Sequence, residues 1–393
     1  MPSALVQRFS PELRAAVFHF TVFGSAGASS VYFAIWLTGK GISAGEIGLI
    51  NALPVLVLLL INQLIGRIAD RAGDWRSVII VLALFAGMVP IGLFFVNSFW
   101  GILAVWTLCA LGSGSIPPVT DAATVRLTQR NGTDFGTVRA WGTVGYMVCT
   151  VASGWIIAWL GPVAFLPLFL GLSLLRTAAA WQLPRFRAPA HEPTLAGLKS
   201  GASRISEMFK PWFLLPLIGF ALVNSSHSVL SGFAALVWHD NGVADGYIGP
   251  LIAVGAAAEA VMMFAWRRVG GNISARQMML IAAIACMVRW TVMAFNPPVA
   301  VLFVLQTLHA LTYGVGYFGA VHFIANWTSE DIAAEAQGLA VVFQQAATVF
   351  ALIGFGWLVN QFGIGAFFGP VALGAVGAGC IVASLIMRPA KAH

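Results

Sequence analysis

An acid and a base stand at matching positions on either side of a turn in the first half of the chain. Asn131 and Gly132 form a turn signal, and Asp121 and Arg139 lie nine residues to either side of position 130. If both flanks are helical, a rise of ~1.5 Å per residue places each charge about 13 Å from the turn, so the two charges can face one another. A charge inside a membrane span is costly unless it is paired or faces a cavity, so the pair predicts part of a substrate or ion pathway. The alternative is a structural ion pair that joins two helices.

Tyr146 extends this candidate site along the second helix of the hairpin. It lies seven residues after Arg139 and therefore shares its helix face, where it can offer a ring beside the charged pair. Pro117 and Pro118 are expected to kink the preceding helix just before Asp121. Glycines such as Gly142 and Gly145 favour close helix packing.

The second half of the chain has a polar set of its own, in which His227, Glu259, Arg289 and His309 each stand alone in an apolar run. Because neither Glu259 nor Arg289 can be buried cheaply without an opposite charge, each is the candidate partner of the other. A lone histidine is more often a hydrogen-bonded packing residue than a proton carrier, so the role of His227 stays open. Gln344 could bond in the same cavity or hold helices together.

The composition places these residues in a lipid bilayer. Of all residues 59% are hydrophobic and 9% are charged, and the mean hydropathy of +0.87 is far above that of a soluble chain. The sequence therefore predicts an all-α membrane protein. The apolar runs predict twelve transmembrane helices, at about 13–38, 44–68, 77–97, 99–127, 136–161, 162–183, 212–239, 244–268, 276–295, 298–326, 332–361 and 363–387.

Basic residues gather in the loops on one side of these spans. Only Lys40 falls in a loop on the other side, although the loop with Glu330, Asp331 and Glu335 lacks a base. By the positive-inside rule, both termini are cytoplasmic, as expected of an inner (plasma) membrane protein. The residues that support this orientation are Arg8, Arg14, Arg67, Arg71, Arg76, Arg126, Arg130, Arg185, Arg187, Lys199, Arg204, Lys210, Arg267, Arg268, Arg276, Arg388 and Lys391.

The two halves repeat each other. The segment IWLTGKGISAGEIGLI, which begins at Ile35, matches LVWHDNGVADGYIGPLI, which begins at Leu236, and Gly41 recurs 201 residues later as Gly242. The expected domains are a six-helix bundle at 1–183, a cytoplasmic linker at 184–211 and a second six-helix bundle at 212–393. Two parallel six-helix repeats are typical of the major facilitator architecture.

The loop after the second span resembles the loop motif of the major facilitator superfamily. It reads GRIADRAGDWR, and its gating residues are expected to be Gly66, Asp70, Arg71 and Gly73. The glycines would permit a tight turn, and Asp70 could meet a helix N-terminus or a basic partner. An ordinary positive-inside turn would explain the arginines, but not the glycines and Asp70 together.

The whole chain resembles a family of symporters. PVTDAA and DFGTVRAWGTVGY look like segments of proton-coupled oligosaccharide symporters of the lactose permease type, whereas VWHDNGVADGYIGPLIAVGAAAEAV and SARQMMLIAAIACMVRW look closer to the phenylpropionate permease family. The resemblance implies that Asp121 and Arg139 hold substrate and that Tyr146 stacks on it. It also implies a polar network of Glu259, Arg289 and His309 in the second half.

Several positions depart from the lactose permease type. Thr312 stands where that type has its proton-carrying carboxylate, Gln306 and Gln344 replace two lysines, and His227 and Leu230 replace their acidic partners. Both sides of each ion pair have changed together, as expected when an unpaired charge would be left buried. The departures argue against lactose as the substrate, and they agree with the phenylpropionate permease pattern. They leave Glu259, Asp121 and His309 as candidates for proton coupling.

These observations predict a transporter and exclude an enzyme, because no zinc-type histidine pair, phosphate loop or nucleophile elbow is found. The expected function is proton-driven import of an aromatic monocarboxylate such as a phenylpropionate by alternating access, since two arginines can bind a carboxylate in bidentate geometry. The alternatives are a sugar, oligosaccharide or nucleoside proton symporter, or a drug/proton antiporter. The partners expected are the small-molecule substrate, protons and the lipid bilayer. A monomer without cofactor, metal or nucleic acid is expected.

Overall fold

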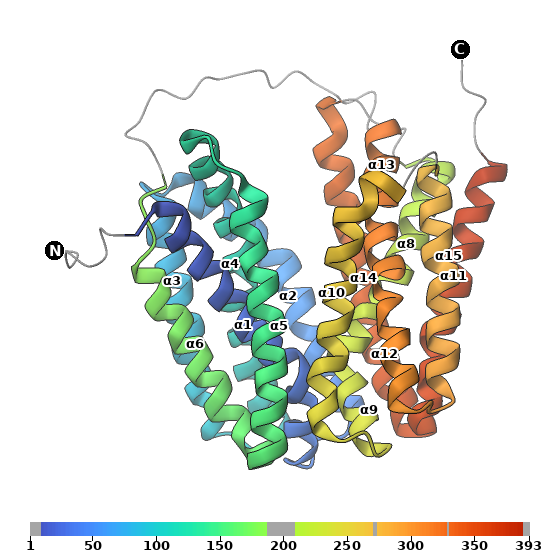
Figure 1. Cartoon of the computed structure of the whole chain (residues 1–393), viewed down its shortest axis with the longest axis horizontal. Helices are drawn as coiled ribbons and strands as arrows, with labels where there is room; N and C mark the ends of the chain where they lie inside the picture. The colour runs from blue at the N-terminus through green and yellow to red at the C-terminus, as the bar shows by residue number, and fades with distance from the viewer. Residues whose placement is uncertain (1–8, 187–208, 270–272, 328–329, 388–393) are drawn as a thin grey trace. The chain divides into compact units, whose positions relative to one another are not determined.

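The computed structural model describes residues 9–186, 209–269, 273–327 and 330–387, and these are almost wholly helical (Figure 1). The chain divides into two compact units, one made of residues 1–194 and 244–253 and the other of residues 195–243 and 254–393. The linker expected at 184–211 lies mostly outside the described residues, and the expected domain limits stay predictions. Each unit is described by itself below.

The first unit contains a bundle of six helices, and polar residues cap the starts of four of them. Ser10, Ser43, Asp74 and Asp134 each accept a backbone N–H at a helix start, and Ser43 forms a capping box with Glu46. The helices are α1 (Pro11–Thr38), α2 (Ala44–Arg71), α3 (Trp75–Met88), α4 (Phe99–Asn131), α5 (Phe135–Leu160) and α6 (Phe165–Trp181), with 3-10 turns at Val89–Phe94 and Pro162–Ala164.

The second unit contains two helices that are widened by π-helical turns. A π-helical segment, Leu230–Ala234, joins α8 to α9, and another, Ala310–Val315, leads into α13. Such bulges are rare and occur often at functional sites. The helices are α8 (Pro211–Val229), α9 (Ala235–Asp240), α10 (Asp245–Val269, which belongs to this unit from Val254 on), α11 (Ala275–Ala294), α12 (Val299–Thr307), α13 (Gly316–Trp327), α14 (Glu330–Phe362) and α15 (Phe368–Ile386).

The all-helical membrane architecture is confirmed. Among the described residues, eleven stretches are long and apolar enough to cross a membrane. The last of them, Gly338–Ile386, contains most of α14 and all of α15, with a turn at Gly363 between the two helices, where φ is 54°.

The hairpin of α4 and α5 forms as the sequence predicts. Gly132 turns the chain with a φ of 66°, a left-handed conformation that glycine adopts without steric cost. Asp134 then caps α5 by accepting the Thr137 N–H at 2.6 Å. Hydrogen bonds from the Thr137 side chain and backbone lower the pKa of Asp134, so the cap stays charged at neutral pH.

The loop motif after α2 differs in part from its expected form. Gly66 lies inside α2, which continues to Arg71, and the chain turns at Ala72 and Gly73. The carboxylate at the start of α3 belongs to Asp74, which accepts the N–H of Arg76 and also that of Phe186. Gly66 therefore does not form the turn, because the helix break comes six residues later at the extended backbone of Ala72.

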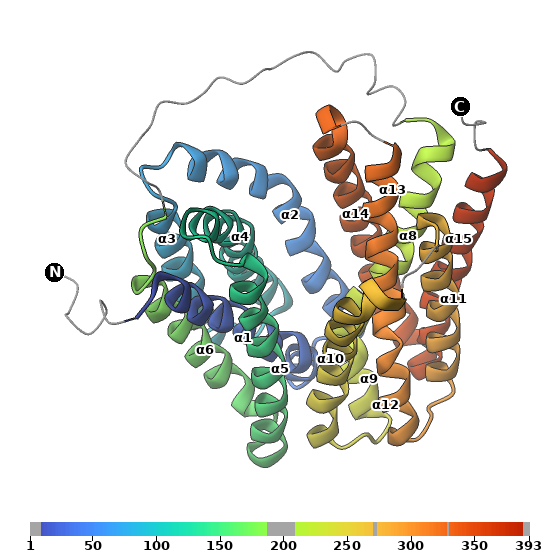
Figure 2. The same cartoon turned by 45° about the horizontal axis from the view of Figure 1, so that its top comes forward.

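Helices α1 and α5 touch almost backbone to backbone (Figures 1 and 2). A Cβ atom on Gly27 would lie 2.6 Å from the carbonyl oxygen of Tyr146, and one on Gly145 would strike the carbonyl oxygen of Phe20. The close packing expected of Gly145 is thus present, and only glycine fits at these contacts.

Candidate functional site

Asp121 of α4 and Arg139 of α5 form the predicted ion pair. The Arg139 Nε lies 3.2 Å from Asp121 Oδ1, and the two side chains are 30% and 37% exposed. The Arg139 guanidinium also lies 4.0 Å from the centre of the Phe23 ring of α1, in a cation–π contact. The first unit thus presents a partly open charged pair beside an aromatic face.

His19 of α1 completes this group on the other side of Asp121. Its Nδ1 lies 3.9 Å from Asp121 Oδ1, and its Nε2 lies 3.1 Å from the hydroxyl of Thr124. Because that hydroxyl donates its one hydrogen to the Thr120 carbonyl at 2.8 Å, it must accept from His19 Nε2. The other ring nitrogen of His19, Nδ1, faces the Asp121 carboxylate.

His19 was not predicted as part of the site from the sequence, although a histidine inside an apolar helix was the available signal.

Tyr146 lies on α5 with Arg139, but its hydroxyl bonds elsewhere. Its oxygen is 3.1 Å from the Ser30 hydroxyl of α1. The side chain is half-buried. The structure thus brings Asp121 and Arg139 together and ties Tyr146 to α1.

Glu259 and Arg289 have partners other than the ones expected. Glu259 Oε2 of α10 lies 3.1 Å from His309 Nε2. Arg289 of α11 is fully buried and donates to Gln306 Oε1 at 2.5 Å and to Thr312 Oγ1 at 3.5 Å. The expected pairing is corrected because the helix that carries His309 supplies an imidazole to the carboxylate and neutral oxygens to the guanidinium.

Two histidines and a tyrosine gather beside the π-helical segments. The ring centres of His227 and His309 are 4.5 Å apart, and the ring of Tyr313 stacks on His309 at 5.5 Å. His309 directly precedes the segment Ala310–Val315, and His227 lies three residues before Leu230–Ala234. Within the described part of the chain, neither ring nitrogen of His227 has a hydrogen-bond partner. Ring contacts, not a hydrogen bond, hold His227 in place.

Gln344 joins two helices of the second unit. Its Oε1 accepts from Asn224 Nδ2 of α8 at 3.5 Å, and one turn later the hydroxyls of Ser228 and Thr348 lie 3.3 Å apart. These contacts fit the second of the two roles considered for Gln344, the interhelical one. A role in binding substrate stays a prediction.

The sequence of this helical chain matches a known protein family over most of its length. The family model described as "MFS_1 like family" matches residues 13–373. The chain belongs to the MFS_1 like family. The predicted resemblance to major facilitator transporters of the phenylpropionate permease type is confirmed, and so is the exclusion of an enzyme.

Two relatives in this family cover most of the chain. The "Probable 3-phenylpropionic acid transporter" of Escherichia coli (strain K12) is 28% identical over 367 residues, which cover 90% of this chain and 92% of that protein. The maltose permease of Geobacillus stearothermophilus is 26% identical over 360 residues, 89% of this chain and 88% of that protein. The crystal structure of the nucleoside transporter NupG shares the fold with a TM-score of 0.80 at 14% identity, covering 98% of this chain and all of that one.

A stability prediction follows for this MFS_1-like protein from the buried Arg289. Gln306→Leu removes the 2.5 Å acceptor of the guanidinium, and a hydrogen bond to a charged group contributes about 1.5–3 kcal/mol. We expect a lower thermal unfolding midpoint in detergent without ligand. Gln306→Glu should keep the midpoint, because it supplies an acceptor and a counter-charge. Thr307→Val is the control, since Thr307 is exposed and bonds only within its own helix. An unchanged midpoint for Gln306→Leu would contradict this role.

Proposed function

We propose that this protein is a proton-coupled symporter that imports a small aromatic monocarboxylate, such as a phenylpropionate, by alternating access. The observation that carries the proposal is Arg139, a partly exposed guanidinium held by Asp121 and lying on the Phe23 ring. The printed name of the Escherichia coli relative supports the same substrate class.

The geometry of Arg139 suits a carboxylate ligand. Asp121 forms an ion pair with the guanidinium on its Nε side, and the terminal nitrogens supply four further N–H donors that a substrate can use. A bidentate contact to a carboxylate is the strong mode for arginine. A substrate ring can pack near Phe23, which already lies against the guanidinium. One cation and one ring therefore match the two ends of an aromatic acid.

Proton coupling is assigned to Glu259 and His309. Their 3.1 Å contact joins a carboxylate and an imidazole, and a proton can reside on either group. His19 and Asp121 form a second such contact in the first unit, at 3.9 Å. Glu259 is the favoured carrier, because Asp121 already forms an ion pair with Arg139 in the proposed substrate site, whereas Glu259 contacts a histidine.

The proposed topology has twelve spans in two six-helix repeats, with both termini in the cytoplasm of a monomer in the inner membrane. The stretch Gly338–Ile386 supports the count, because it holds two helices separated by a turn and has 49 residues. One span needs only about 20 residues. The clustering of basic residues supports the orientation.

The substrate class is tested by ligand-induced stabilisation of the purified protein. A ligand that binds the folded state stabilises it by RT ln(1 + c/Kd), where c is the free ligand concentration, so at equal concentration a tighter ligand raises the unfolding midpoint more. We expect 3-phenylpropionate to raise the midpoint far more than 3-phenylpropionamide, which keeps the ring and loses the charge. Maltose and uridine serve as comparison ligands.

The second candidate function is symport of a sugar or nucleoside, for which Asp121 would accept hydroxyl groups. The similarity to a maltose permease favours it. A shift with maltose or uridine and none with the acid would select this candidate. Equal shifts with the acid and its amide would overturn the carboxylate assignment.

A further inference from the structure

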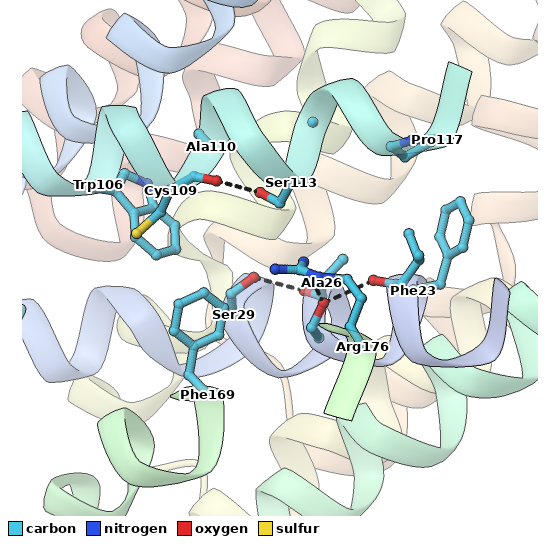
Figure 3. Close-up of a pocket in the computed structure, with 13 residues that line it drawn as sticks. Phe23, Ala26, Ser29, Trp106, Cys109, Ala110, Ser113, Pro117, Phe169 and Arg176 are labelled. Atoms are coloured by element: carbon cyan, nitrogen blue, oxygen red, sulfur yellow. Dashed lines mark hydrogen bonds between the residues drawn. The ribbon is translucent and has the colours of Figure 1, made fainter. Parts of the chain in front are cut away.

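A cavity of about 200 Å³ lies inside the first unit, between α1, α4 and α6. Figure 3 shows the Arg176 side chain between α4 and α1, with Trp106 and Phe169 toward one end of the cavity and Phe23 and Pro117 toward the other. The ring centres of Trp106 and Phe169 are 5.6 Å apart. The cavity therefore combines an aromatic end with a single cation.

Arg176 of α6 is a buried cation that has no acidic partner among the described residues. Its side chain is 2% exposed, and it donates to the Ser25 hydroxyl at 3.1 Å and to the Ala86 carbonyl at 2.8 Å. Its Nε has no hydrogen-bond partner, and no carboxylate of the described residues forms an ion pair with it. Neutral oxygens compensate a buried charge only in part, so a bound anion would stabilise this guanidinium further.

The cavity wall offers little to a polyhydroxylated ligand. The hydroxyls of Ser29 and Ser113 donate to carbonyls of their own helices, those of Ala26 and Cys109. Their hydrogens are thus used, and the wall is otherwise mainly apolar. A cavity of about 150 Å³ is known to hold benzene, so 200 Å³ takes one ring with a short acidic arm.

We propose that this cavity binds a small aromatic carboxylate, with Arg176 as its counter-charge and Trp106 and Phe169 against its ring. This subsite is separate from the Asp121–Arg139 pair, but Phe23 belongs to both, since it lines the cavity and lies under the Arg139 guanidinium. The choice of ligand class rests on the proposed function. The alternative is that Arg176 only fastens α6 to α1 and α3 through Ser25 and Ala86.

Titration calorimetry of the purified full chain distinguishes these roles. We expect the unaltered protein to bind 3-phenylpropionate at least tenfold more tightly than 3-phenylpropionamide. In the Asp121→Asn/Arg139→Gln background, which lacks the other proposed acid site, Arg176→Gln should weaken binding of the acid at least tenfold and leave binding of the amide unchanged. The matched control is Arg276→Gln, because Arg276 is also buried and also donates to a hydroxyl and a carbonyl, those of Ser384 and Trp212. This control should keep the preference for the acid.

A second pair of variants covers the case in which Arg176→Gln does not fold. Ser113→Leu fills the cavity without removing a bond between helices, and in the Asp121→Asn/Arg139→Gln background it should weaken both ligands at least tenfold. Thr107→Leu, on the same helix but outside the cavity, also loses only a bond to its own helix and should bind normally.

Two results overturn the proposal in different ways. In the Asp121→Asn/Arg139→Gln background, unchanged preference for the acid after Arg176→Gln, or normal binding after Ser113→Leu, overturns this subsite and leaves the proposed function standing. Equal binding of the acid and the amide by the unaltered protein overturns the carboxylate class and this subsite together.

Discussion

Arg139→Gln is expected to abolish uptake of 3-phenylpropionate into proteoliposomes. The variant loses the ion pair to Asp121 and the proposed donor to the substrate carboxylate. A charge-assisted hydrogen bond of about 3 kcal/mol corresponds to roughly a hundredfold in affinity. The single variant should also unfold more easily, because it leaves the Asp121 carboxylate without its partner.

The double variant Asp121→Asn/Arg139→Gln separates the two effects. Because it leaves no charge unpaired, it should fold better than Arg139→Gln alone while still failing to transport. Arg126→Gln is the control, since Arg126 is an exposed arginine on the same helix as Asp121. If the double variant folds and binds the acid normally, the pair serves only to join α4 to α5.

Glu259→Gln is expected to uncouple substrate movement from the proton gradient. The amide keeps the shape of the side chain and a hydrogen bond to His309, but it cannot titrate. The variant should exchange labelled 3-phenylpropionate at equal concentrations on both sides of a liposome membrane. It should not accumulate the acid when an inward proton gradient is imposed.

The matched control for this experiment is Glu46→Gln, which changes a carboxylate at the N-terminal cap of α2. It should accumulate substrate normally, because glutamine also completes a capping box. Uphill accumulation by Glu259→Gln would rule Glu259 out as the carrier. His309→Gln and Asp121→Asn would then be the next variants to compare.

Local patterns in the sequence predicted the helices and the Asp121–Arg139 pair well. The pair could be predicted because a short turn fixes the register of two antiparallel helices, so equal spacing from position 130 implies similar depth. The partners of Glu259 and Arg289 could not be predicted from spacing around a turn. They depend on how separate helices pack and on the wide π-helical turn beside His309, which ordinary helical spacing does not describe.

Arg176 and His19 were missed for a different reason. Each is a polar residue inside an apolar run, so the signal was present, but neither has an obvious partner nearby in the sequence. His19 meets Asp121 from a helix about a hundred residues away, and Arg176 faces a cavity lined by three helices. Only tertiary packing shows that His19 adjoins the predicted pair and that Arg176 lines a cavity.

The glycine contacts of α1 and α5 have a mechanical consequence. Helices α1 and α5 touch through their backbones at Gly27 and Gly145, so a side chain at either position would force the two helices apart. His19 and Arg139 both belong to this closely packed pair of helices, whereas Asp121 belongs to α4. In α4 the consecutive prolines Pro117 and Pro118 remove two backbone N–H donors one turn before Asp121, which makes that turn the compliant joint. Flexing at that turn would move the Asp121 carboxylate relative to both His19 and Arg139, so one bend in α4 would change two contacts together.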